Sequence, residues 1–194
     1  MRAPARIAKH LLSFVPCAGR DCGGGKIGLA GGRTSLEERG KNMAQKVIDI
    51  NMHMLPTNLF TDEEVLNGFL YSCPQSYGFA AYLAPTPDGQ KQQMVLEYPK
   101  GYEILNYVEG DYTLEAKLTA MDEAGVDIAL LRMPVWQEWL PLDICKIVND
   151  QAKQMMEDSE GRLLFNAVLP PWGRKEDIKE LERCLDMGAV GVQF

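Results

Sequence analysis

Histidine is rare in this chain, and only one of its two histidines lies where a buried strand would end. His10 belongs to the N-terminal stretch, whereas His53 follows the apolar run of residues 47–50. A β-branched run of this length predicts a buried strand. Because side chains two positions apart in a strand share a face, Asp49, Asn51 and His53 are expected together. Imidazole, amide and carboxylate groups on one face could hold a divalent metal ion or support its ligands.

Two more candidate residues follow the second apolar run, residues 126–131. Arg132 stands at its end, where a guanidinium could grip the carboxylate of a substrate, although a solvated or ion-paired arginine is commoner. Trp136 could offer an aromatic surface to a substrate, although tryptophan is more often a packing residue. Gln193 would face the same side if the pleat turns it inward. With two histidines no Ser/His/Asp or Cys/His set can be assembled, so no catalytic residue is assigned.

Strands and helices alternate through the part of the chain that carries these residues. The predicted order is a strand at 47–50, a helix capped by Asp111 or Thr113 that ends at Gly125, a strand at 126–131, a helix at 142–158, a strand at 163–169, a helix at 175–187 and a strand at 189–194. Apolar strands joined by helices are typical of a parallel sheet covered by helices.

The choice between a barrel and an open sheet rests on the end of the first strand. No Gly-x-Gly-x-x-Gly follows it, which disfavours an open dinucleotide-binding sheet. Polar residues at the carboxyl end of a strand suit the catalytic face of a barrel. About four strands make half of a (β/α)8 TIM barrel, which takes about 250 residues. We therefore expect an α/β fold that is a partial TIM barrel of about four parallel strands.

A long segment, residues 57–110, separates the first strand from the first predicted helix. It is expected to be largely irregular, with a hairpin of residues 80–83 and 93–98 around the turn-forming PTPDG sequence. A connection of this length in a compact domain is usually functional.

The N-terminal residues differ sharply in charge from the rest. Residues 1–42 carry eight basic and three acidic side chains and a Gly-rich run, whereas the remaining residues carry 12 basic and 24 acidic ones. We expect residues 1–42 to be a disordered leader or not natively translated, because residues 37–42 can be encoded by a purine-rich stretch that resembles a bacterial ribosome-binding site before Met43. The globular domain is then residues 43–194.

Composition narrows the function classes further. A net charge of -7 argues against nucleic acid and anionic membranes as partners, since both need concentrated Lys and Arg. The five cysteines are scattered without a CxxC pair, so neither a disulfide framework nor a cysteine zinc site is indicated. A reducing cytoplasm fits best.

Several segments together resemble the amidohydrolase-related family, in its aminocarboxymuconate-semialdehyde decarboxylase-like branch. Residues 47–56 read VIDINMHMLP, similar to the family's strand-one signature I-D-x-H-x-H-x-x-P. Residues 118–127 contain MDEAGVD, similar to the family's entry into strand two, and residues 148–150, 161–162 and 181–192 are similar to its later units. The resemblance spans nearly all of residues 46–194.

The resemblance implies a metal-dependent hydrolase or non-oxidative decarboxylase that acts on a small carboxylated substrate. The metal would be divalent, zinc first and manganese second, with His53 as a ligand and Arg132 as the carboxylate clamp. Asn51 stands at the first histidine of the signature, and because an amide is a weak zinc donor, it would be a weak ligand or an orienting group. Other ligands would lie beyond Phe194, so the chain is expected to hold the N-terminal half of the barrel only.

A second reading comes from the edges that a half-barrel leaves open. Unpaired strand edges are rarely left uncovered in soluble proteins. The alternative is therefore a non-catalytic half-barrel subunit or remnant that pairs with another chain or with a second copy of itself.

Overall fold

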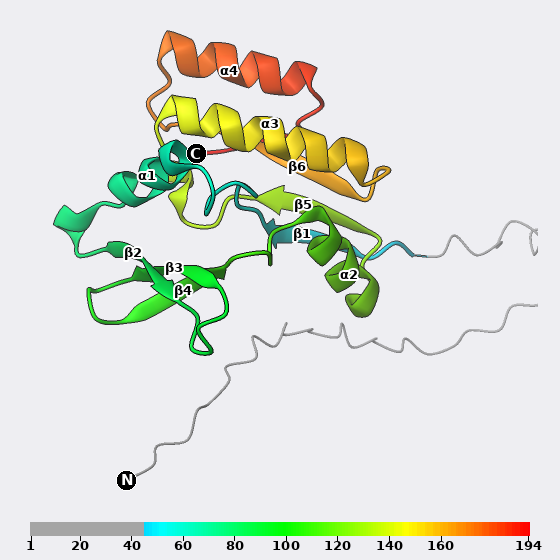
Figure 1. The fold of residues 1–194 in the computed structure, drawn as a ribbon. Helices are drawn as coiled ribbons and strands as arrows, with labels where there is room; N and C mark the ends of the chain where they lie inside the picture. Colours follow the sequence, from blue (N-terminus) through cyan, green and yellow to red (C-terminus); the bar gives the residue numbers. More distant parts are fainter. Residues whose placement is uncertain (1–44) are drawn as a thin grey trace, which may run out of the picture. The chain divides into compact units, whose positions relative to one another are not determined.

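The computed structural model describes residues 45–194. Its main sheet has four parallel strands in chain order, and Figure 1 labels the first three of them. The strands are β1 (Ile48–His53), β5 (Ile128–Arg132), β6 (Leu163–Val168) and β7 (Gly191–Gln193), arranged β1-β5-β6-β7. An open dinucleotide-binding sheet reverses its strand order at the centre, whereas barrel strands follow the chain. The described residues therefore form a partial TIM barrel, as predicted, and the expected leader, residues 1–42, lies outside them.

Three helices connect or precede these strands where the sequence predicted them. They are α2 (Leu114–Ala124), α3 (Leu142–Asp158) and α4 (Lys175–Asp186). Thr113, rather than Asp111, caps α2, because its hydroxyl accepts a hydrogen bond from the backbone N–H of Ala116 at 3.3 Å. α3 packs along β6, and α4 lies beside α3 (Figure 1). None of the helices within residues 45–194 combines the length and the apolar character that a bilayer crossing needs.

One face of the main sheet forms the core beneath the helices. Strand pairing alternates the side chains, and those on this face are almost completely buried: Ala129, Leu131, Leu163, Phe165 and Ala167. They join apolar residues of α3 in one cluster. Asn149 of α3 also bonds to β6, donating to the carbonyl of Val168 at 3.1 Å and accepting from its N–H at 2.8 Å. This helix is thus fixed to the sheet by burial and by directed bonds.

The long segment after β1 is more ordered than predicted. It contains α1 (Glu63–Ser72), a short 3-10 helix (Gln75–Tyr77), and an antiparallel sheet of β2 (Ala80–Pro85), β3 (Gln92–Glu97) and β4 (Glu103–Val108). The β2–β3 hairpin confirms the prediction. The expectation of a largely irregular remainder is wrong, since α1 and β4 lie in it.

A helix signal for α1 is present in the sequence. Asp62 caps the helix by accepting from the N–H groups of Glu64 and Val65 at 3.0 and 3.3 Å, and the buried Val65 and Phe69 are four residues apart. Gly68 weakens the pattern, because glycine is unfavourable in a helix interior. Its role is tertiary: a Cβ there would lie 2.5 Å from the side chain of Ile144 in α3. Glycine lets α1 and α3 approach.

Candidate functional site

The carboxyl ends of β1 and β5 bring together three of the predicted site residues. Strand pairing sets His53 opposite Arg132, so their side chains lie on one face of the sheet. That face is opposite to the one buried beneath the helices, because Leu131 belongs to the latter. The Nη1 group of Arg132 donates a long hydrogen bond of 3.4 Å to the amide oxygen of Asn51. We call these residues and Lys117, described below, the strand-end cluster.

A β-bulge places Asp49 differently from the prediction. The pairing of β1 with β5 shifts between Asp49 and Met52, so that Asp49 pairs with the fully buried Ala129. Ala129 and Arg132 lie on opposite faces of β5, and the extra residue of the bulge therefore separates Asp49 from the face of His53. The Asp49 carboxylate accepts a hydrogen bond from the backbone N–H of Asn51 at 2.8 Å. The expectation of one shared face was wrong because it assumed unbroken alternation.

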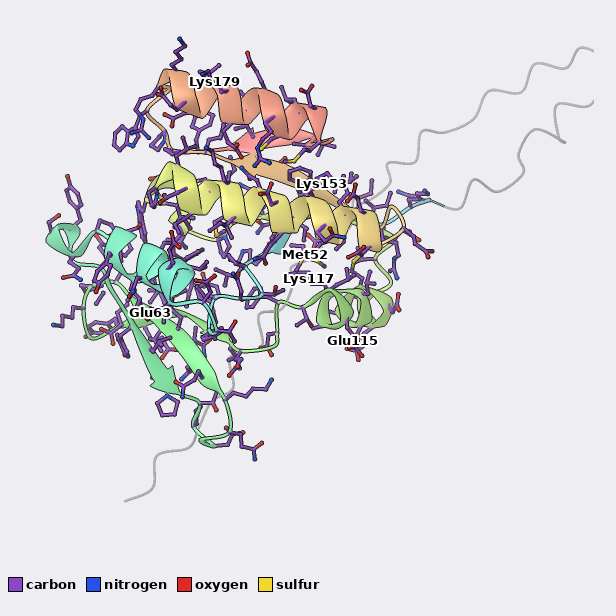
Figure 2. The ribbon with its side chains drawn as sticks, turned by 45° about the horizontal axis from the view of Figure 1, so that its top comes forward. Met52, Glu63, Glu115, Lys117, Lys153 and Lys179 are labelled. Carbon is purple, nitrogen blue, oxygen red and sulfur yellow. The ribbon has the colours of Figure 1, made fainter. Side chains whose placement is uncertain are left out.

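Lys117 is the member of the cluster that the sequence analysis missed. It projects from α2 toward the end of β1, is only 5% exposed, and donates from Nζ to the backbone carbonyl of His53 (Figure 2). Its Nζ atom lies 5.0 Å from the centre of the Tyr112 ring. Within residues 45–194 neither Lys117 nor Arg132 forms a salt bridge. One feature of the sequence could have indicated it: Lys117 is three residues after Leu114 and four before Met121, so it lies on the apolar face of the helix.

The electrostatics of the cluster favour anions. Burial lowers the pKa of Lys117 to about 8. Partial burial lowers the pKa of His53 most, and the charges of Lys117 and Arg132 lower it further, while Asp49 acts in the opposite direction. His53 is therefore a neutral imidazole at neutral pH, next to two unpaired cations.

The described residues do not fit a divalent metal ion. No group of three or more His, Cys, Asp or Glu side chains within residues 45–194 is placed to hold one. Of the two predicted ligands, Asn51 already accepts from the Arg132 guanidinium, and His53 stands beside two positive charges. A divalent cation at this point would meet one imidazole and one occupied amide oxygen, with repulsion from both cations.

Two residues predicted near the site have structural contacts. Trp136 is fully buried, donates from its indole N–H to the carbonyl of Phe69 at 3.0 Å, and packs against Phe69 and Tyr107. Its ring offers no accessible surface in this structure. Gln193 does lie on the face of Arg132, by its pairing with Val168, but its amide is bound to the backbone of Met133.

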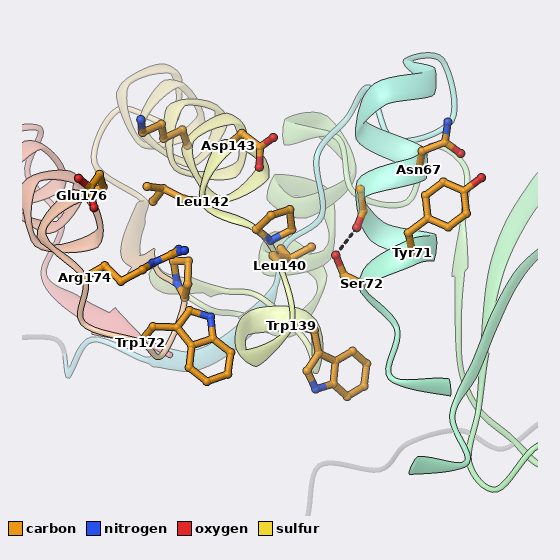
Figure 3. A pocket seen from close by; sticks show the side chains of 14 residues that line it. Asn67, Tyr71, Ser72, Trp139, Leu140, Leu142, Asp143, Trp172, Arg174 and Glu176 are labelled. Atoms are coloured by element: carbon orange, nitrogen blue, oxygen red, sulfur yellow. Dashed lines mark hydrogen bonds between the residues drawn. The ribbon is translucent and has the colours of Figure 1, made fainter. Parts of the chain in front are cut away.

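A separate groove of about 920 Å³ lies where the segments after β5 and β6 approach α1 (Figure 3). Tyr71 and Trp172 are exposed at it, and Lys146, Asp143 and Arg174 add charges of both signs. None of its lining residues belongs to the strand-end cluster. The groove is therefore separate from the strand-end cluster.

Comparison with known proteins gives similarity in solved structures only. No protein-family model and no curated protein matches the chain. A crystal structure called amidohydrolase II is 20% identical with a TM-score of 0.47, over 76% of this chain and 39% of the other. An amidohydrolase from Mycobacterium avium subsp. paratuberculosis K-10 is 13% identical with a TM-score of 0.38, over 76% of this chain and 48% of the other. The chain thus spans less than half the length of either.

Proposed function

We propose that the strand-end cluster binds the carboxylate of a small substrate, in an enzyme of the amidohydrolase-related kind that catalyses hydrolysis or non-oxidative decarboxylation. One observation carries the proposal: Arg132 and the buried Lys117 flank His53 without a carboxylate partner among the described residues. Buried charges are normally paired. A bound carboxylate would supply the missing negative charge.

The roles of the side chains follow from their positions. The planar guanidinium of Arg132 can donate two parallel hydrogen bonds to a carboxylate. Lys117, which is nearly inaccessible, would act through its positive charge and by holding the end of β1. Neutral His53 could accept or donate a proton at the substrate. In the resembled family a divalent ion polarises the substrate, and no step is assigned to it here because the donor set does not fit one.

The test is a titration of the full chain with benzoate, followed through the ring signal of His53 in a chain with ¹³C-labelled histidine, because His53 pairs with Arg132 and is present in every variant. We expect this signal to shift with benzoate and not with the neutral analogue benzamide. Arg132→Met should abolish binding, whereas Lys179→Met, which removes an equal charge from an exposed position on α4, should leave it unchanged. Equal shifts with benzamide, or unchanged binding in Arg132→Met, would refute the proposal.

A second candidate function is supported by the open edges of the sheet. β1 and β7 each have only one neighbouring strand among the described residues. Ile50 on β1 is 69% exposed, and Phe194 after β7 is also exposed. Exposed apolar edge strands are sites of pairing with other chains. A half-barrel subunit that pairs with a second copy would cover both edges.

Light scattering coupled to size-exclusion chromatography tests this candidate. Pairing predicts a dimer of the full chain that Ile50→Lys converts to a monomer. Tyr102→Lys, at an exposed position between β3 and β4 of the separate antiparallel sheet, should leave the dimer intact. A parent chain that is monomeric at all concentrations would rule out pairing with itself.

A further inference from the structure

We infer that the guanidinium of Arg132 takes the position of a metal ion beside Asn51 and His53, so that this strand end excludes divalent cations. The inference concerns the binding preference of the site and does not depend on which reaction follows. It rests on the contact of Asn51, on the charges around His53 and on an unpartnered donor of Arg132.

The first step is the contact between Asn51 and Arg132. The amide oxygen of Asn51 accepts from Nη1 of Arg132 at 3.4 Å. An amide oxygen accepts readily from a guanidinium, while it is a poor ligand for zinc. The amide oxygen of Asn51 is therefore used as an acceptor for the guanidinium of Arg132. A metal ion at this position would have to compete with that cation for the same oxygen.

The second step is the charge that surrounds His53. Nζ of Lys117 donates a hydrogen bond to the backbone carbonyl of His53 at the end of β1. Arg132 pairs with His53 from the neighbouring strand β5. Among residues 45–194 the one acidic group that acts on His53 is Asp49, whose carboxylate accepts from the N–H of Asn51. Two cations against one anion leave the site positive. A divalent ion would add repulsion, whereas an anion would relieve it.

The third step is an unpartnered donor. Nε of Arg132 is shielded from solvent and has no hydrogen-bond acceptor within the part of the chain that the structure describes. Buried polar groups without a partner are uncommon, and at a functional site they indicate a group that arrives with a ligand. A carboxylate or another oxyanion would provide the acceptor, and a metal cation could not.

The experiment measures zinc at His53 in the full chain, through the ring signals of ¹³C-labelled histidine. Because His10 and the cysteines can also take up zinc, the His53 signal is identified by its loss in His53→Ala. We expect no zinc shift at His53 in the parent chain. The double variant Asn51→His, Arg132→Met should show a zinc shift at His53 and bind zinc there at least about tenfold more tightly than the parent chain. It adds a second imidazole beside His53 and removes a repelling charge.

A matched variant separates the guanidinium from net charge. The double variant Asn51→His, Lys179→Met changes the net charge by the same amount but keeps Arg132. We expect it to bind zinc about tenfold more weakly than the first double variant. Urea unfolding verifies that all variants fold. Zinc binding at His53 in the parent chain, or equal zinc affinity of the two double variants, would overturn the inference.

The outcome is distinguishable from that of the proposed function. If benzoate does not bind but zinc is excluded from His53 until Arg132 is removed, the inference stands and the carboxylate substrate does not. If benzoate binds through Arg132 and zinc also binds His53 in the parent chain, the inference falls alone.

Discussion

The side-chain amide of Gln193 bonds to both backbone groups of Met133. Its oxygen accepts from the N–H of Met133 at 2.9 Å, and its nitrogen donates to the carbonyl at 2.7 Å. Gln193 belongs to β7 and Met133 follows β5, with β6 between them. Because neighbouring strands lie about 4.8 Å apart, this contact requires the sheet to curve toward the face of Gln193. That face also carries His53 and Arg132.

Replacing Gln193 by leucine should destabilise the fold. The change keeps an apolar stem but leaves the buried N–H and carbonyl of Met133 unpaired, at a cost of about 2 kcal/mol or more. The free energy of unfolding in urea measures it. Gln90→Leu, at an exposed turn position, should change that energy by less than about 0.5 kcal/mol. Equal effects of the two changes would show that the amide contact contributes nothing.

Lys117→Met should stabilise the fold near neutral pH. Burial lowers the pKa of the Lys117 ammonium to about 8, below the value of about 10.4 for an exposed lysine. The unfolded chain therefore binds the proton more tightly than the folded one, and the charged lysine costs the folded state about 3 kcal/mol below pH 8. Methionine fills similar space without that charge, and the lost hydrogen bond to the carbonyl of His53, about 1 kcal/mol, offsets only part of the gain.

The pH dependence of this effect has a definite sign. Between pH of about 8 and about 10.4 the lysine has lost its proton in the folded chain but keeps it in the unfolded chain. Unfolding therefore takes up a proton in this range, and the free energy of unfolding of the parent rises with pH relative to that of Lys117→Met. The difference between the two unfolding energies isolates Lys117 from the cysteines, whose thiols ionise in this range in the unfolded chain, whereas burial raises the pKa of Cys145 and Cys184 to about 12 in the folded one. Lys179→Met should show no such trend. A difference that stays constant across this range would contradict the buried charge.

Gly68→Ala should destabilise the packing of α1 on α3. In an isolated helix the same change would stabilise by about 1 kcal/mol. Here the new Cβ would lie 2.5 Å from Cγ1 of Ile144, and overpacking of this kind costs about 1–3 kcal/mol. The double variant with Ile144→Ala should recover part of the helix-propensity gain in a double-mutant cycle. A Gly68→Ala variant as stable as the parent would show that α1 and α3 do not approach each other this closely.

Trp136 should act on stability and not on carboxylate binding. Truncation of this fully buried ring to alanine is expected to cost about 3–5 kcal/mol. Trp172, which is 70% exposed, should tolerate alanine within about 0.5 kcal/mol. Trp136→Phe should keep the benzoate affinity of the parent. A selective loss of benzoate binding in that variant would return Trp136 to the site.

The sequence by itself determined the order of elements in the partial barrel. Apolar periodicity and helix-end signals are local, so they located α3 at residues 142–158 and the Gly125 end of α2, while the start of α2 stayed open between Asp111 and Thr113. The sequence also placed His53 and Arg132 each at the carboxyl end of a predicted parallel strand, and such strand ends lie at one edge of the sheet.

Tertiary structure decided what the strand-end cluster can bind. The bulge that separates Asp49 from His53 depends on pairing with β5, and the burial of Lys117 and Trp136 depends on elements distant in the chain. The alternation of side chains along a single strand predicts neither the bulge nor this burial. The charge around His53 is a sum over three segments, and only their packing fixes its sign.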